Sequence, residues 1–218
     1  MRYTEALSTH SSQAANKTLR NTYGLLSLTL LFSAFTAGIS MAFNLPHPGL
    51  ILTLVGFYGL LFLTYKCRNS AVGLLCVFAL TGFMGLTLGP ILNGYLSMAN
   101  GTSIIMSALG MTGLSFLGLS AYAIVSKKDF SFLNGFLTVG FFALVFAMIA
   151  GFFIQLPALQ IFISVGFTLF SAAVILLQTS EIVRGGETNY IMATVNLYVS
   201  LYNMFLSLLS LFGMASDD

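Results

Sequence analysis

The chain has 218 residues, of which 57% are hydrophobic and 6% are charged. Soluble domains carry about 25% charged residues, so this composition excludes a protein whose surface faces only water. The formal net charge of +2 is too small to indicate nucleic acid as a partner. We therefore expect the lipid bilayer to be the main solvent, where only helices or closed barrels satisfy the backbone.

The predicted elements are helices, because the apolar runs are about 20 residues long and continuous rather than alternating. In chain order, we expect seven transmembrane helices at 23–43, 49–65, 71–92, 103–125, 132–153, 157–178 and 189–212. The polar segment 1–22 is predicted to be a flexible cytoplasmic tail. Residues 23–213 would form the transmembrane domain, and 214–218 a short periplasmic tail.

The basic residues predict the orientation of these helices. They all fall before the first span or after the second, fourth and sixth spans: Arg2, Lys17, Arg20, Lys66, Arg68, Lys127, Lys128 and Arg184. Short basic loops stay in the cytoplasm. The N-terminus is therefore expected inside and the C-terminus outside, in the periplasm if the membrane is a bacterial inner membrane.

Glycine and proline mark the third predicted span. Gly85 and Gly89 have the spacing that lets two helices pack closely, which we favour over a glycine hinge. Pro90 follows directly, and it removes one backbone hydrogen bond, so a kink near the outer face is expected.

Residues suited to catalysis are sparse. No carboxylate lies inside a predicted span, and His10 and His47 fall in the tail and a loop. The motifs of zinc proteases and serine hydrolases are missing, and Cys67 and Cys76 have no metal-like spacing, so free thiols are expected. We expect no enzyme, no cofactor and no bound metal.

The last span carries the strongest polar pattern. Five side chains follow one helical face: Asn196, Ser200, Asn203, Ser207 and Ser210. An amide facing lipid would lack a partner, so this face should point into the bundle. These groups either join helices by hydrogen bonds or line a polar cavity. Gln178 and Glu181, at the end of the sixth span, should face the inner mouth of the bundle.

A charged turn separates the last two spans. Gly185 and Gly186 are expected to end the sixth helix. Thr188 or Asn189 can then cap the seventh, with Glu187 near its positive end. This capped turn explains most of the polar residues in QTSEIVRGGETNY.

Several long strings resemble one family. The segments KKDFSFL, EIVRGGETNYIMATVNLYVSLYNMFLSLL and LFGMASDD are similar to the Bax inhibitor-1 family of seven-span proteins, and GLILTLVGFYGLLFLTYK, LGPILN and RGGETNY resemble its bacterial YccA type. The resemblance implies a seventh helix surrounded by six others. It also implies an inner-membrane protein that binds and modulates the protease FtsH, with the protease's membrane-embedded partner proteins as further candidates.

The resemblance also supplies an alternative, because some family members are pH-sensitive calcium leaks controlled by two carboxylates. Those positions correspond to Gln178 and Ser200, with Lys66 or Arg68 as the nearby cation. Neither Gln nor Ser can titrate or supply the anionic oxygen that calcium prefers. We therefore expect calcium not to be a ligand, although Glu181 could partly substitute.

Three functions remain open from the sequence. The first is a modulator of FtsH that is gripped through its N-terminal tail, with Arg2, Tyr3, Thr4 and Glu5 as the handle, and is extracted slowly. The second is a cation or proton leak through a cavity along Asn196, Ser200 and Asn203. It would be closed near Gln178 and Glu181. The third is a small-solute transporter, which lacks support from intramembrane charge or an inverted repeat.

Overall fold

The computed structural model describes residues 2–154 and 156–216, with the side chains of residues 2–12 and 152 excluded. These residues form seven helices and no strand. The helices are α1 (Arg2–Ala42), α2 (Leu50–Cys67), α3 (Ala71–Leu96), α4 (Gly101–Ser126), α5 (Leu133–Phe153), α6 (Pro157–Val183) and α7 (Tyr190–Ser216). All seven contain a segment long and apolar enough to cross a membrane, which confirms the predicted number of spans.

The first helix begins far earlier than the sequence predicted. Hydropathy placed its start at residue 23, whereas α1 runs from Arg2 and its apolar segment from Gln13. Residues 2–22 contain no Pro or Gly. Extending a helix that is already nucleated adds one hydrogen bond per residue, so a polar segment without breakers can continue it. Flexibility of segment 1–22 stays a prediction.

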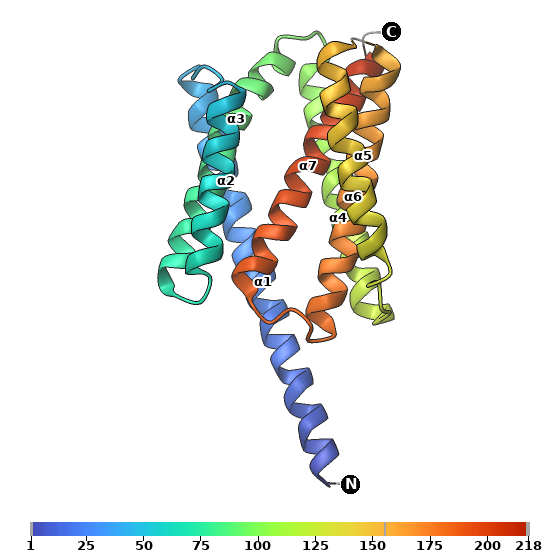
Figure 1. Ribbon diagram of the computed structural model, residues 1–218. Helices are drawn as coiled ribbons and strands as arrows, with labels where there is room; N and C mark the ends of the chain where they lie inside the picture. Colours follow the sequence, from blue (N-terminus) through green and yellow to red (C-terminus); the bar gives the residue numbers. More distant parts are fainter. Residues whose placement is uncertain (1, 155, 217–218) are drawn as a thin grey trace.

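The last helix lies between two groups of helices (Figure 1). On one side it contacts α1 and α3, and on the other side α4 and α6. The outer helix α2 packs mainly on α3, and α5 packs on α6. More than half of the apolar segment of α7 is buried, a larger share than in the other six helices.

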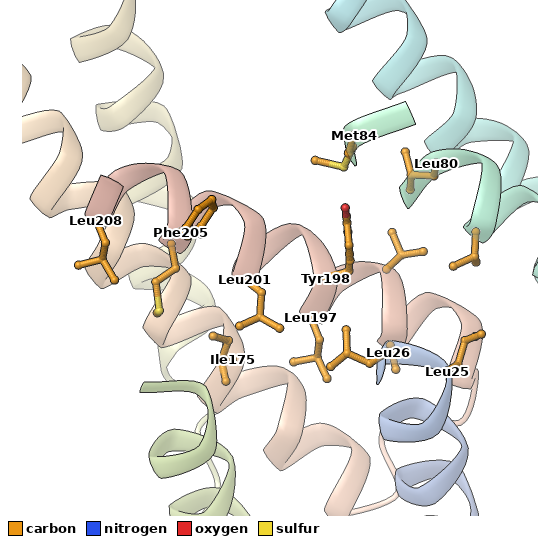
Figure 2. Packing of buried hydrophobic residues seen from close by; sticks show 14 of the residues in the cluster. Leu25, Leu26, Leu80, Met84, Ile175, Leu197, Tyr198, Leu201, Phe205 and Leu208 are labelled. Atoms are coloured by element: carbon orange, nitrogen blue, oxygen red, sulfur yellow. The ribbon is translucent and has the colours of Figure 1, made fainter. Parts of the chain in front are cut away.

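Large side chains on α7 build the core on two sides of that helix. Figure 2 shows Tyr198 directed toward Leu80 and Met84 of α3, whereas Leu197 lies on the opposite side of the helix, toward Ile175 of α6. Apart from Met84, these side chains are at most 1% exposed. Because partners on both sides cover it, α7 can carry polar residues without exposing all of them to lipid.

The contact between α1 and α3 depends on glycine. A methyl group added at Gly85 would overlap Thr36 Oγ1 and the Ser33 carbonyl oxygen, and one added at Gly89 would overlap Ser40. The predicted close-packing role of these two glycines therefore matches the contacts that the structure shows.

The structure explains how Pro90 is accommodated inside α3. Proline has no N–H, so the carbonyl oxygen four residues earlier, at Leu86, loses its helical partner. The Ser40 hydroxyl on α1 donates to that oxygen at 2.8 Å. The helix continues through Pro90 to Leu96, because a neighbouring helix replaces the missing donor.

The connections after α2, α4 and α6 lie at the end of the bundle where α1 begins (Figure 1). Arg184 forms an ion pair with Asp129, and the Ser180 hydroxyl donates to the Lys128 carbonyl oxygen at 2.7 Å. These contacts tie the α4–α5 connection to the end of α6, so the basic connections are part of the packed structure.

Candidate functional site

The turn between α6 and α7 is built as its sequence predicts. Gly185 has a φ of +77°, a left-handed conformation that favours glycine. The Asn189 side-chain oxygen accepts the Met192 N–H at 3.0 Å and caps α7. Glu187 accepts the Asn189 N–H at 2.7 Å, which places a carboxylate near the positive end of the helix.

The same asparagine connects this turn to the α2–α3 connection. Asn189 Nδ2 donates to the Arg68 carbonyl oxygen at 3.0 Å and to Asn69 Oδ1 at 2.9 Å. The Arg68 guanidinium lies over the Tyr65 ring, 4.5 Å from its centroid, and Lys66 is exposed. Within the described residues, neither Lys66 nor Arg68 forms an ion pair. The ion pair at this end of the bundle joins Arg184 to Asp129.

The acidic residues gather at this end of the bundle and not in its interior. Glu181 is half-buried in the last turn of α6. Hydrogen bonds from Ser131 and from Arg184 lower the pKa of the Asp129 carboxyl to about 2. Asp129 therefore stays ionised at physiological pH.

The structure brings Gln178 to Asn196. Asn196 Nδ2 donates to Gln178 Oε1 at 2.8 Å and joins α6 to α7. The Gln178 side chain is 5% exposed. Its Nε2 atom has no hydrogen-bond partner. Ser200 does not complete this contact, because its hydroxyl donates to the Asn196 carbonyl oxygen of its own helix at 2.8 Å.

The predicted polar face combines both roles that the sequence left open. At one end Asn196 bonds to Gln178, and near the other end the Ser164 hydroxyl donates to Ser210 at 3.2 Å. Between these contacts lies a cavity of about 170 Å³ between α2, α6 and α7. We call it the polar notch, and its polar lining consists of Ser171, Asn196, Ser200 and Asn203.

Two tyrosine hydroxyls on the other side of α7 have partners in the facing helices. The Tyr198 hydroxyl is hydrogen-bonded to Ser33 at 2.5 Å and donates to the Thr81 carbonyl oxygen at 3.2 Å. Tyr202 bonds to Thr87 at 3.2 Å. Serine and threonine in the facing helices could have predicted these contacts from the sequence, because buried tyrosine hydroxyls need hydrogen-bond partners.

The four residues predicted to form a protease handle lie at the start of α1. Arg2, Tyr3, Thr4 and Glu5 are helical in backbone, and their side chains are outside the described set. The N-terminal part of α1 extends beyond the bundle (Figure 1), whereas the polar notch lies between α2, α6 and α7, so the two are separate regions of the protein.

Comparison with known proteins decides the family. The model of the Bax1-I family, described as "Inhibitor of apoptosis-promoting Bax1", matches residues 15–217. The chain belongs to this family. The match covers all seven transmembrane helices, so the family assignment applies to the whole bundle.

Bacterial relatives match over nearly their full length. A protein of Escherichia coli K12 named "Modulator of FtsH protease YccA" is 57% identical over 99% of this chain and 95% of its own. An uncharacterised Pseudomonas aeruginosa protein is 60% identical over 92% of this chain and 90% of its own. A Vibrio cholerae membrane protein is 43% identical over 99% and 97%.

The contact between α6 and α7 in this Bax1-I chain is a neutral pair. The resemblance assigned the two acidic positions to Gln178 and Ser200, whereas the structure pairs Gln178 with Asn196. Neither amide changes charge with pH. The hydrogen bond between Gln178 and Asn196 therefore does not titrate with acid.

Proposed function

We propose that this protein modulates the membrane protease FtsH from within the bacterial inner membrane. The observation that carries the proposal is the full-length relative at 57% identity, which is named as a modulator of that protease. A second relative, from Escherichia coli O6, is named "Inner membrane protein YccA". The alignment with the first relative covers 99% of this chain and therefore includes every helix of the bundle.

We place the N-terminus in the cytoplasm and the C-terminus in the periplasm, with α7 as the central helix. The one-sided distribution of basic residues supports the orientation, and the contacts of α7 with α1, α3, α4 and α6 support its position. In this arrangement α1 enters from the cytoplasm, where its polar N-terminal turns would be accessible to a protease.

The mechanism we propose is slow extraction. The protease grips residues 2–12 and pulls on α1. That helix is interlocked with α3 at Gly85 and Gly89 and is bonded to α3 through Ser40. A gripped chain that resists removal occupies the protease and slows the degradation of other membrane substrates.

Co-purification tests the binding step. The tagged chain is extracted from native membranes in mild detergent, and FtsH is detected by immunoblot together with the protease's membrane-embedded partner proteins. We expect FtsH to be recovered with this chain and not with an unrelated seven-helix membrane protein. Equal recovery with both would overturn the proposed function.

Deletion of residues 2–12 tests the handle. We expect the shortened chain to persist longer in cells and to lose its protection of a second FtsH substrate. A control in which the deleted segment is replaced by an unrelated polar sequence of the same length separates length from sequence. If the deleted and full-length chains turn over and protect equally, the handle lies elsewhere.

A further inference from the structure

The polar notch contains hydrogen-bonding groups that the chain itself does not satisfy. The Ser171 side chain is 1% exposed, lines the notch, and its hydroxyl has no hydrogen-bond partner. The Asn203 amide makes no hydrogen bond within the described residues. Gln178 Nε2, behind Asn196, is also without a partner. Each unpartnered buried polar group costs about 1–3 kcal/mol.

The depth of the notch limits where a partner can come from. Asn203 and Ser171 lie near the midpoints of α7 and α6. With a rise of 1.5 Å per residue, each is about 18–20 Å from the helix end nearest the basic connections. That distance is more than half the thickness of the hydrocarbon core, about 30 Å. Lipid headgroups therefore do not reach the notch, which leaves water or a transmembrane helix of another protein as the source of a polar partner.

The position of the notch gives such a helix access. Two side chains of α2, Phe57 and Leu61, form one wall, and Phe170 of α6 belongs to another. The helix α2 packs mainly on α3, while α6 packs on α7. All three wall residues are half-exposed, and Asn196 is exposed. The notch is therefore reached from the lipid side, between two outer helices.

Size and charge narrow the class of ligand. A volume of about 170 Å³ is too small for a whole helix, whose diameter is about 10 Å, and suits one inserted side chain. The lining groups are neutral hydroxyls and amides. An anionic or cationic group would remain uncompensated there, so the complementary group is a neutral hydroxyl or amide.

We propose that the polar notch receives a Ser, Thr, Asn or Gln side chain from a transmembrane helix of a partner protein. This inference rests on the proposed function, since FtsH is the partner whose transmembrane helix would bind at the notch. One inserted side chain supplies donors and acceptors to Asn203, and the partner helix covers the exposed faces of α2 and α6.

Photo-crosslinking tests the contact. Benzoyl-phenylalanine replaces Phe170 or Phe57 at the rim of the notch, or Phe116 on α4 as the control, which is also a half-buried phenylalanine. After irradiation of intact cells, we expect FtsH adducts from positions 170 and 57 and few or none from position 116. Equal yields at all three positions, or adducts only with a second copy of this chain, would overturn the proposal.

Two substitutions test the chemistry. Asn203→Leu keeps a similar volume and removes the amide, and we expect recovery of FtsH to fall about threefold to tenfold, as for one lost interhelical hydrogen bond. Asn203→Gln keeps an amide and should retain most of the binding. If wild-type chain binds FtsH and Asn203→Leu binds it equally, the notch proposal fails while the proposed function stands.

Thiol accessibility distinguishes a partner side chain from water. In a background carrying Cys67→Ser and Cys76→Ser, the variant Asn203→Cys is exposed to a membrane-impermeant, water-soluble thiol reagent. We expect labelling in membranes lacking FtsH to be as slow as for Leu169→Cys on the lipid-exposed face. Rapid labelling would identify the notch as a water-filled chamber and overturn the proposal.

Discussion

The two sides of α7 handle polar groups in opposite ways. Toward α1 and α3, the Tyr198 and Tyr202 hydroxyls are bonded to partners in the facing helices. Toward α2 and α6, Asn203 and the buried Ser171 hydroxyl lack partners within the described residues. The tyrosine hydroxyls therefore form a closed polar network on one side, beside which the buried Thr22 hydroxyl of α1 has no partner. The network on the other side is incomplete.

This difference suggests that one side of α7 stabilises the bundle and the other side binds a partner. A satisfied buried network stabilises one arrangement of helices, whereas an incomplete network gains free energy when a second molecule completes it. The closed side includes the interlocked α1–α3 pair, which we expect to resist extraction. The incomplete side faces lipid, where a partner helix can approach.

Gly85→Leu should have the largest effect, because it breaks the closed side. The new side chain would overlap Thr36 and the Ser33 backbone. We expect a loss of about 3 kcal/mol or more, or failure of the protein to accumulate, measured by thermal unfolding in detergent. Gly113→Leu is the matched control, since a Cβ there meets open space. Similar losses in both variants would contradict the interlocked contact.

Gln178→Glu should have the next largest effect, because it places a carboxyl in a buried neutral contact. An ionised carboxylate without a cation costs more in this buried place than a protonated one. Stability should therefore be retained at low pH and lost as pH rises. We expect a loss of about 2–3 kcal/mol at pH 8 relative to pH 5, measured by thermal unfolding at both pH values.

Wild-type chain is the control for that experiment, because its Gln178–Asn196 contact does not titrate. The same neutral contact predicts no calcium flux through liposomes that contain only this protein. Calcium flux through the wild-type chain would contradict the neutral-pair account and favour the leak function that the family resemblance offered.

Tyr198→Phe and Asn203→Leu compare the two sides directly. The first leaves Ser33 without the tyrosine hydroxyl, and we expect a loss of about 1–3 kcal/mol. The second removes an amide that has no partner in the described chain, so the isolated protein should be equally stable or more stable. Urea or thermal unfolding of both variants in one detergent gives the comparison, and equal losses would remove the distinction between the sides.

The smallest effect is expected from acid at Asp129. Its pKa is lowered to about 2 by hydrogen bonds from Ser131 and from Arg184. Its contribution to the folded state is therefore present above the ordinary carboxyl pKa and is lost as pH falls toward 2. The protection factors for amide hydrogen exchange of residues 127–132, corrected for the intrinsic effect of pH on exchange, should stay unchanged from pH 7 to pH 5 in wild type. Asp129→Asn should show lower protection factors across that whole range.

The sequence predicts the parts of this structure that depend on local pattern. Hydropathy located seven helices. The capped turn follows from two residue types favoured at such positions, because glycine tolerates the left-handed conformation of Gly185 and the Asn189 side chain can accept a backbone N–H. The start of α1 was missed, because hydropathy reports burial in lipid and not helix formation. Low hydropathy therefore predicted a tail for a segment that continues the helix, because it contains no proline or glycine to end it.

Contacts between helices could not be predicted from one sequence. The polar face of α7 was visible, but pairing Gln178 with Asn196 rather than Ser200 requires the register of α6 against α7. Ser40 as the partner of the Leu86 carbonyl oxygen depends on the close approach of α1 to α3. These relations are set by tertiary packing, which no local propensity encodes.

A reconstituted degradation assay tests the central claim most directly. FtsH and one of its membrane substrates are placed in lipid vesicles, with this chain or with the Gly85→Leu variant, and substrate loss is followed over time. The account predicts that wild-type chain slows substrate loss while being degraded slowly itself, and that the variant is degraded faster and protects less. Unchanged substrate loss in the presence of wild-type chain would contradict it.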